Sequence, residues 1–423
     1  MSDKATYSKF RWFVLLTLCV ATITQAVALI APAPFMGIIA KELGLSIGET
    51  TGAIMGSFTL LVALSCIVGG IFIDKIGLIR VFLVSLVLII IGRVLVPVVG
   101  NNIQSLIILR IIEGCGAGPI AASVSSIAAI WFPVKERPIV AGIAGMATGL
   151  GVAIGFISAP AIFQVTGSWQ MAMAWLSAFS FLSIVLTLVV AFGPKPAGDL
   201  PQSSDVLVSG AGDFAVALRQ PVTWVCVLCV FALSWMFSAF NDLTPGYLAI
   251  EQPVGIGLGP MEAGKTMMIY QVAFMAGSML SGFVTGKIFR GQAKLTVLLG
   301  FLVAAIFCVS IKYSAVYSNG GTLLLCLILA GFFMSFVNPQ VMAFIARYYP
   351  EHITGKIGGL AMGIGIFGAT IGVIAGASAL HATGLYHMSI NIVGTVAIIG
   401  FIIALGLNPP KAFCINDKKY WES

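Results

Sequence analysis

Long runs of apolar residues constrain the fold of this chain more than any other feature. Residues 12–30, 81–99 and 175–192 are typical of these runs. A helix of about 20 apolar residues spans the hydrocarbon core of a bilayer and satisfies its backbone hydrogen bonds within one segment. The composition agrees, because 59% of the 423 residues are hydrophobic and only 9% are charged. The sequence therefore predicts an all-α integral membrane protein.

Charged residues, prolines and glycine clusters divide the chain into twelve expected spans. A polar stretch rich in Pro, Gly, Ser and Asp separates the first six from the last six, and we expect it to form a cytoplasmic linker at residues 194–220. An N-terminal six-helix bundle would cover residues 1–193 and a C-terminal one residues 221–423. The expected spans are 12–31, 50–73, 80–99, 103–131, 138–163, 170–193, 221–248, 263–286, 294–315, 321–346, 354–379 and 387–407.

The basic residues lie mostly between the spans. Most of the 22 Lys and Arg residues fall in segments on the same side as the N-terminus. Because basic loops mark the cytoplasmic side, we expect a multi-pass protein of the cell (inner) membrane with both termini in the cytoplasm. The formal charge of +7 then reflects orientation, and no basic domain outside the spans is left to bind nucleic acid. We expect the protein to be a monomer in the lipid bilayer.

Reactive groups are sparse, which argues against an enzyme. Cys226 and Cys229 form a CxxC pattern, but it lies in an apolar run without a nearby His, so coincidence explains it better than redox or metal chemistry. The sequence has neither an HExxH motif nor a nucleophile with a partner His. We therefore expect no catalytic residue, no metal site and no cofactor.

The two halves of the chain repeat one pattern. Trp-Phe-Pro at 131–133 precedes three spaced glycines, and Tyr-Tyr-Pro at 348–350 precedes three more at the same intervals. Duplication of a six-span unit indicates a transporter with two six-helix bundles related by pseudo-two-fold symmetry. Small residues at such spacing also predict close packing of the fifth and eleventh spans. The repeated glycines are Gly142, Gly151 and Gly155, and then Gly359, Gly368 and Gly372.

A short loop after the second span carries charges beside glycines. Gly70 permits close helix contact, Gly77 permits a tight turn, and Asp74 can face the positive N-terminal end of another helix. The loop resembles the signature loop of the major facilitator superfamily, and the matching residues are Gly70, Asp74, Lys75, Gly77 and Arg80. The resemblance implies a cytoplasmic gate that closes against the start of the eleventh span. A plain sidedness signal is the alternative interpretation.

The corresponding place in the second half departs from this pattern. Gly286 stands where the first half has Asp74, and Lys287 follows it. We therefore expect only the first-half loop to act as a gate.

Two charged side chains lie within the fourth span. Arg110 and Glu113 are three residues apart and share one face of the helix. A charge near the middle of the bilayer costs at least about 2.5 to 3.5 kcal/mol on insertion scales, so such groups are functional candidates. Arg110 also matches the arginine of the superfamily's fourth-span motif. The alternative is that the pair only locks helices together. Arg93, in the third span, could face the cavity and favour an anionic substrate, but we rather expect it to snorkel toward the outer headgroups.

Other polar side chains at mid-membrane depth outline a mildly polar cavity. The resemblance implies that the first, fourth, seventh and tenth spans line it, although a single polar residue more often forms a packing hydrogen bond. Asp242, near the end of the seventh span, is a candidate ligand for a proton or the substrate, or else a plain interface acid. The remaining candidates for substrate binding or coupling are Gln25, Asn241, Tyr270, Gln271, Asn338 and Gln340.

Three details of the sequence narrow the range of expected substrates. The fifth span lacks the Gly-Pro-x-x-Gly-Gly element of proton-driven drug efflux members, and the second and eighth spans lack the arginines of nitrate carriers. The loop at residues 131–137 is similar to that of the bacterial organic anion symporter, cyanate-permease and oxalate/formate-type branches.

These resemblances imply a secondary active transporter whose small-molecule substrate is an organic anion, preferably a carboxylate. It would work by alternating access, in proton-coupled uptake or exchange, with Glu113 or Asp242 carrying the proton. Efflux of a drug-like or neutral solute stays open, as does a transporter-like sensor that does not transport.

Overall fold

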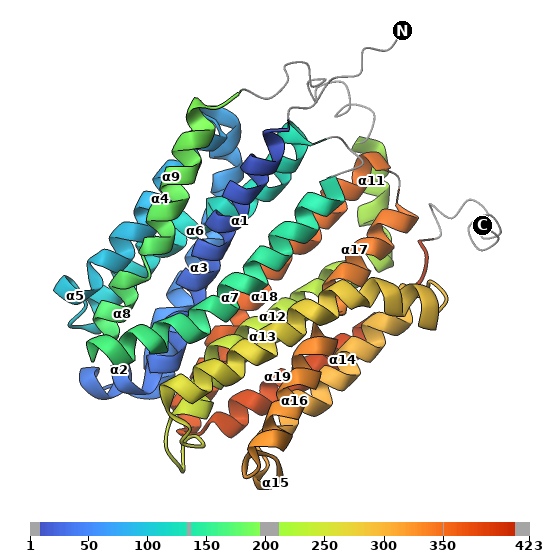
Figure 1. The fold of residues 1–423 in the computed structure, drawn as a ribbon. Coiled ribbons are helices and arrows are strands. Elements are labelled where there is room, and N and C mark those ends of the chain that lie inside the picture. The colour runs from blue at the N-terminus through green and yellow to red at the C-terminus, as the bar shows by residue number, and fades with distance from the viewer. Residues whose placement is uncertain (1–8, 133–136, 195–210, 350, 411–423) are drawn as a thin grey trace. The chain divides into compact units, whose positions relative to one another are not determined.

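Long helices joined by short loops form the structure (Figure 1). It is a computed structural model that describes residues 9–132, 137–194, 211–349 and 351–410. Twelve helical segments of these residues are long and apolar enough to cross a membrane. The predicted all-α membrane fold with twelve spans is therefore confirmed.

The first six spans are all helical, and the first, third and sixth are interrupted. Pro32, Pro34 and Pro97 stand at two of these breaks, where they remove N–H groups that a continuous helix would use. The elements are α1 (Arg11–Ile30), η1 (Ala33–Phe35), α2 (Met36–Leu43), α3 (Ile47–Ile76), α4 (Leu78–Val94), α5 (Val96–Val99), α6 (Ile103–Trp131), α7 (Arg137–Thr166), α8 (Trp169–Trp175) and α9 (Ala178–Phe192).

The last six spans are helical too, and a short helix precedes them. This helix, α11 (Ala211–Leu218), lies in the segment predicted as a linker, of which residues 195–210 lie outside the described part. The eighth span ends in a π-helical turn, η3. The other elements are α12 (Pro221–Ala249), α13 (Gly259–Phe283), η3 (Val284–Ile288), α14 (Ala293–Ser310), α15 (Ser314–Tyr317), α16 (Gly320–Met334), α17 (Val337–Tyr348), α18 (Glu351–Thr383) and α19 (Tyr386–Ala404).

The chain forms two compact units. The first holds the N-terminal helices together with the second part of α12, the first part of α13 and the last part of α18. We call the end of the first unit where α1 ends and α3 begins its distal end. The predicted boundary at residues 194–220 and the pseudo-two-fold relation stay predictions. The first unit comprises Met1–Leu200, Ala239–Val272 and Val373–Ser389, and the second comprises Pro201–Ser238, Ala273–Gly372 and Ile390–Ser423.

Helix α6 packs closely against α3 because the facing residues of α6 are glycines. A Cβ at Gly118 would lie 2.0 Å from Ser65 Oγ, and one at Gly114 would lie 2.8 Å from the backbone of α3. The Ser65 hydroxyl donates a hydrogen bond to the Gly114 carbonyl at 2.9 Å. This contact fixes α6, which carries Arg110 and Glu113.

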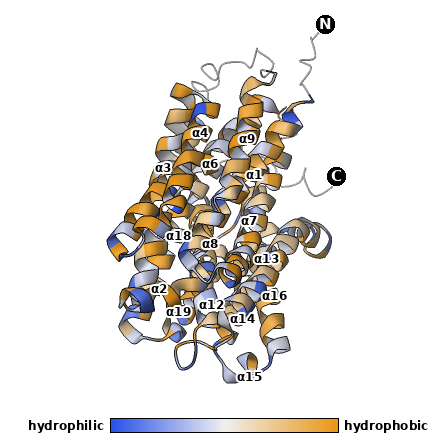
Figure 2. Ribbon diagram, turned by 60° about the vertical axis from the view of Figure 1, so that its left-hand side comes forward, coloured by the Kyte–Doolittle hydropathy of each residue, from blue (hydrophilic) through white to orange (hydrophobic). Residues whose placement is uncertain are grey.

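Large apolar side chains cover much of the outside of the helices. Figure 2 shows hydrophobic residues along most of the length of the helices. Val98, Val165 and Phe192 are among the most exposed of them. A water-soluble monomer rarely exposes so much apolar surface, whereas a membrane protein places it against lipid.

Candidate functional site

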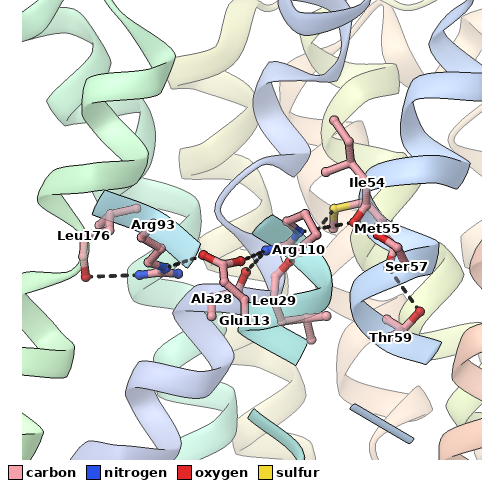
Figure 3. A network of polar contacts seen from close by, with 10 residues as sticks. All are labelled: Ala28, Leu29, Ile54, Met55, Ser57, Thr59, Arg93, Arg110, Glu113 and Leu176. Atoms are coloured by element: carbon pink, nitrogen blue, oxygen red, sulfur yellow. Dashed lines mark hydrogen bonds and ion pairs between the residues drawn. The ribbon is translucent and has the colours of Figure 1, made fainter. Parts of the chain in front are cut away.

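A network of polar contacts surrounds Arg110 inside the first unit (Figure 3). The Nε of Arg110 donates to the Ile54 carbonyl at 3.1 Å, and Nη1 donates to the Ala28 carbonyl at 2.8 Å. Its Nη2 donates to the Leu29 carbonyl at 3.2 Å and lies 4.0 Å from the sulfur of Met55. Arg110 therefore ties α6 to the end of α1 and to α3.

The end of α1 explains why a cation is stable at this place. Pro32 has no N–H, so it cannot donate to the Ala28 carbonyl four residues earlier. The Arg110 guanidinium donates to that carbonyl instead, and it places a positive charge at the negative C-terminal end of α1. The break in the first span and the buried arginine thus support each other.

Glu113 bridges two arginines. Its Oε2 forms an ion pair with Arg110 Nη1, and its Oε1 accepts from Arg93 Nε at 3.2 Å. Arg93 Nη1 also donates to the Leu176 carbonyl at 3.1 Å. Gly92 leaves room for this arrangement, because a Cβ there would lie 2.3 Å from Glu113 Cγ. The three charged side chains, which are 1% to 6% exposed, form a buried cluster with one excess positive charge.

The position of Arg93 corrects one expectation. The side chain does not snorkel toward the headgroups, because it is fully buried and points to Glu113 (Figure 3). The ion pair and the bond to the Leu176 carbonyl offset the loss of hydration. Its Nη2 has no hydrogen-bond partner within the described part of the chain.

The cluster borders a cavity of about 20 Å³. Pro32, Ile54 and Trp169 are among the other residues that line it. About 10–15 Å³ is enough for one water molecule, so this cavity admits water and excludes an organic anion. In this conformation the contacts of Arg110 and Glu113 are those of a lock between helices, which is the alternative role that the sequence left open.

A second buried acid lies within electrostatic range of Arg110. Asp242 of α12 is 1% exposed, and neither carboxylate oxygen has a hydrogen-bond partner among the described residues. Gln271 of α13 is equally buried, and neither polar atom of its side chain has a partner in that set. The rings of Phe240 and Tyr270, 5.1 Å apart, hold α12 against α13 next to these residues. Buried polar atoms without partners cost about 1 to 3 kcal/mol each, so a functional reason for them is expected.

The other predicted polar residues are divided between the units. Asn241 is buried in the first unit, and Gln25 is half-buried on α1. Asn338 and Gln340 belong to the second unit, where Gln340 Nε2 donates to Ser281 Oγ at 3.1 Å. A single site that includes residues of both units stays a prediction.

Twelve spans, a charged fourth span and the loop after the second span point to one family. Residues 16–320 and 256–418 match the sequence profile of the Major Facilitator Superfamily. The chain belongs to the Major Facilitator Superfamily. It is therefore a membrane transporter rather than an enzyme.

Similar members of the superfamily have different names and substrates. The hexuronate transporter of Bacillus subtilis (strain 168) is 23% identical over 394 residues, which cover 89% of each chain. The D-galactonate transporter of Escherichia coli O6:H1 is 25% identical over 405 residues, 87% of this chain and 89% of the relative. The quinolone resistance protein NorA of Staphylococcus aureus (strain Mu50) is 24% identical over 386 residues, 88% of this chain and 90% of the relative.

The superfamily signature loop lies where α3 meets α4. Gly77 separates the two helices and has a φ of 90°, a backbone conformation that favours glycine. Arg80 is exposed on α4. Gly70 and the side chains of Asp74 and Lys75 lie outside the described residues, so the gate of this superfamily member stays a prediction.

Sequence reasoning misses the groups that hold the arginines. The acceptors are main-chain carbonyls of Ala28, Leu29, Ile54 and Leu176, and every residue type carries such a carbonyl. Pro32 is the one usable signal, because a proline inside an apolar run frees a carbonyl one turn earlier. Within the described ranges, no three His, Cys, Asp or Glu side chains come together as metal ligands.

Proposed function

We propose that this transporter is a secondary active carrier that takes up a small organic anion, preferably a carboxylate, together with a proton. Alternating access would expose the binding site to one side of the membrane at a time. Hexuronate and D-galactonate, after which two relatives are named, are organic anions, and those relatives match most of this chain. Sugar-acid carboxylates are therefore the first substrates to test.

The buried charges of the first unit carry the proposal. Arg93 and Arg110 supply two positive charges, while Glu113 and an ionised Asp242 supply two negative ones. When Asp242 takes up a proton, one positive charge loses its balance, and that charge attracts an anionic substrate. Because a net charge in low-dielectric surroundings is costly, the protein changes conformation most readily with proton and monoanion both bound or both absent.

Of the two candidate acids, Asp242 suits proton transfer better than Glu113. Each carboxylate oxygen of Glu113 already contacts an arginine, so a proton there would break an ion pair. Both oxygens of Asp242 lack hydrogen-bond partners in the described structure, so a proton there breaks no such bond. Asp242 therefore carries the coupling proton in this proposal, and Glu113 holds the two arginines in place.

Asp242→Asn tests the coupling role, because Asn keeps the shape of Asp and removes its ionisable group. In proteoliposomes with an acid exterior, the wild-type protein should accumulate labelled galactonate or glucuronate. Asp242→Asn should lose this accumulation and keep the exchange of internal for external anion, which needs no net proton movement. Undiminished accumulation would reject the role of Asp242. If the wild-type protein transported neither galactonate nor glucuronate, the proposal of organic anion uptake itself would be rejected.

Glu113→Gln is the matched control, since it makes the same carboxylate-to-amide change in the same unit. Loss of the ion pairs with Arg93 and Arg110 should lower thermal stability, because breaking a buried pair costs about 3 to 5 kcal/mol. Accumulation and exchange should then fall together. If both variants behaved alike in all three assays, Asp242 would have no separate coupling role.

Export of a drug-like solute is a second candidate function, and the similarity to the quinolone resistance protein NorA favours it. The missing Gly-Pro-x-x-Gly-Gly element argues against it. Expression in a drug-sensitive host distinguishes export from organic anion uptake, because an exporter would raise quinolone resistance and would not take up sugar acids. A sensor without transport would be stabilised by its ligand and show no flux.

We also propose an orientation and a gate. Both termini face the cytoplasm, the protein acts as a monomer of the inner membrane, and the loop at residues 70–80 closes the cytoplasmic side. Labelling of single cysteines introduced into loops of intact cells tests the orientation. Asp74→Asn should lower turnover more than apparent affinity, and unchanged turnover would argue against the gate.

A further inference from the structure

A cavity of about 440 Å³ lies in the second unit and has no part in the proposed transport mechanism. Thr285 and Gly286 of η3 form one wall, Phe344 and Arg347 of α17 form another, and Lys294 lies at the start of α14. The volume falls within the range of ligand sites in proteins, about 300 to 1,000 Å³. The cavity is thus large enough for the polar group of an organic ligand.

The backbone itself creates this space. A Cβ at Gly282 or at Gly286 would meet no heavy atom within 4 Å. Gly286 is also the position where the first half of the chain has Asp74, so the cavity opens where the second half lacks the signature acid. The π-helical turn Val284–Ile288 adds to the irregularity, and such turns often occur at functional sites.

Among the described residues that line the cavity, the charged ones are Lys294 and Arg347. Lys294 Nζ donates to Asn408 Oδ1 at 2.9 Å, and Arg347 Nη1 donates to the Gly291 carbonyl at 3.2 Å. No acidic residue is among the described residues that line the cavity. The described walls of the cavity therefore carry two basic side chains, which suits an anionic ligand.

Exposed apolar side chains lie within two positions along the chain of residues that line the cavity. Phe283, Ile288 and Leu295 are 55%, 62% and 39% exposed. On helices that cross a membrane, such side chains contact acyl chains. A ligand that binds both the basic cavity and the neighbouring apolar surface has an anionic head and a hydrocarbon tail.

We propose that this cavity binds the phosphate headgroup of an anionic phospholipid. Lys294 and Arg347 contact the phosphate, and the acyl chains lie on the exposed apolar residues of α13, η3 and α14. Basic pockets at the ends of membrane helices attract anionic headgroups in this way. The bound headgroup connects α14 with α17 and thereby stabilises the second unit.

Thermal unfolding of the purified full-length protein in neutral detergent tests the proposal. Phosphatidylglycerol should raise the unfolding temperature of the wild-type protein, and phosphatidylcholine should not. In the double variant Lys294→Gln, Arg347→Gln, the half-saturating concentration of phosphatidylglycerol should rise about thirtyfold. A wild-type protein that phosphatidylglycerol does not stabilise would overturn the proposal.

A second double variant, Lys287→Gln with Arg290→Gln, provides the matched control. It removes the same number of positive charges, from η3 and the turn that follows it, but neither residue is among the described residues that line the cavity, so the response to phosphatidylglycerol should persist. Equal loss in both double variants would mean that only general surface charge matters, which overturns the site. Inorganic phosphate is the third arm, and a shift equal to that of the lipid would mean a free-phosphate site instead.

Gly286→Leu tests the site without a change of charge. The side chain should enter the cavity, because a Cβ at this position meets nothing within 4 Å. The variant should fold and lose the response to phosphatidylglycerol. If phosphatidylglycerol stabilised Gly286→Leu as much as the wild-type protein, the lipid would bind elsewhere. This variant also tests the site if the double variant Lys294→Gln, Arg347→Gln fails to fold.

Discussion

Arg110 makes contacts that a lysine could not reproduce. Its guanidinium donates to the carbonyls of Ala28, Leu29 and Ile54 and also pairs with Glu113. An arginine presents five N–H groups in a planar fork, whereas a lysine presents one compact ammonium. Its burial is therefore stable because several acceptors from α1, α3 and α6 meet at one point.

A methyl group at Gly92 is expected to disturb this cluster. It would lie 2.3 Å from Glu113 Cγ and 2.8 Å from the Leu109 carbonyl oxygen. Overpacking of this kind costs about 1 to 3 kcal/mol, and a displaced Glu113 would lose its contact with Arg93. Gly92→Ala should therefore lower both the unfolding temperature of the purified protein and its transport rate.

Gly142→Ala is the control for this prediction. A Cβ at Gly142 meets no atom within 4 Å, so alanine should be neutral or should stabilise the helix by up to about 1 kcal/mol. A Gly92→Ala protein as stable as Gly142→Ala would contradict the packing described for α4 and α6.

At the scale of elements, glycines pack α7 on α1 and α18 on α12 in the same way. A Cβ at Gly151 would lie 2.7 Å from a backbone carbonyl oxygen of α1, and one at Gly368 would lie 2.4 Å from a backbone carbonyl oxygen of α12. Gly142 and Gly359 have open space instead. Gly151 matches Gly368 in the sequence repeat, and Gly142 matches Gly359. The repeat therefore preserves both the positions of close helix contact and the positions that have open space.

Alanine substitutions at the four positions should therefore fall into two pairs. Gly151→Ala and Gly368→Ala should each destabilise the protein by about 1 to 3 kcal/mol, because the helices must move apart. Gly142→Ala and Gly359→Ala should not. Unfolding temperatures of the four purified variants provide the measurement, and four equal values would refute the packing role.

At the scale of the whole molecule, the distal end of the first unit joins helices from both halves of the sequence. Ser46 Oγ at the start of α3 lies 2.6 Å from His381 Nδ1 near the end of α18. A Cβ at Gly52 would lie 3.3 Å from the Cβ of Ala377. A carrier that works by alternating access must separate these helices when this end opens.

A disulfide at this contact should arrest transport. The Cβ atoms of disulfides are about 3.5 to 4.5 Å apart, so Gly52→Cys with Ala377→Cys needs only a small adjustment. Oxidation should stop uptake by the double variant, and a reducing agent should restore it. Each single variant serves as a control for the native cysteines. Undiminished uptake by the cross-linked protein would mean that this contact persists throughout the cycle.

The sequence by itself determined the twelve spans and the buried charges of α6. Both follow from local properties, since twenty apolar residues in a row and a charge within such a run have few stable environments. The short motifs that indicated the family are also local, so they can be recognised in the sequence without the tertiary structure. Helix ends differ from the expected ones by a few residues, and the breaks near Pro32 and at Ser335 were not predicted, because caps and breaks depend on contacts as well as on sequence.

Only the tertiary structure decided which groups face each other. Arg93 was expected to snorkel and instead binds Glu113, since depth along a helix does not determine direction around it. The sequence also left two roles open for Asp242; its burial on α12 argues against a plain interface acid, and its role in coupling stays a proposal. The carbonyls that hold Arg110 and the open space at Gly286 depend on segments far apart in the chain. Such long-range contacts arise only when the helices pack, so no local pattern encodes them.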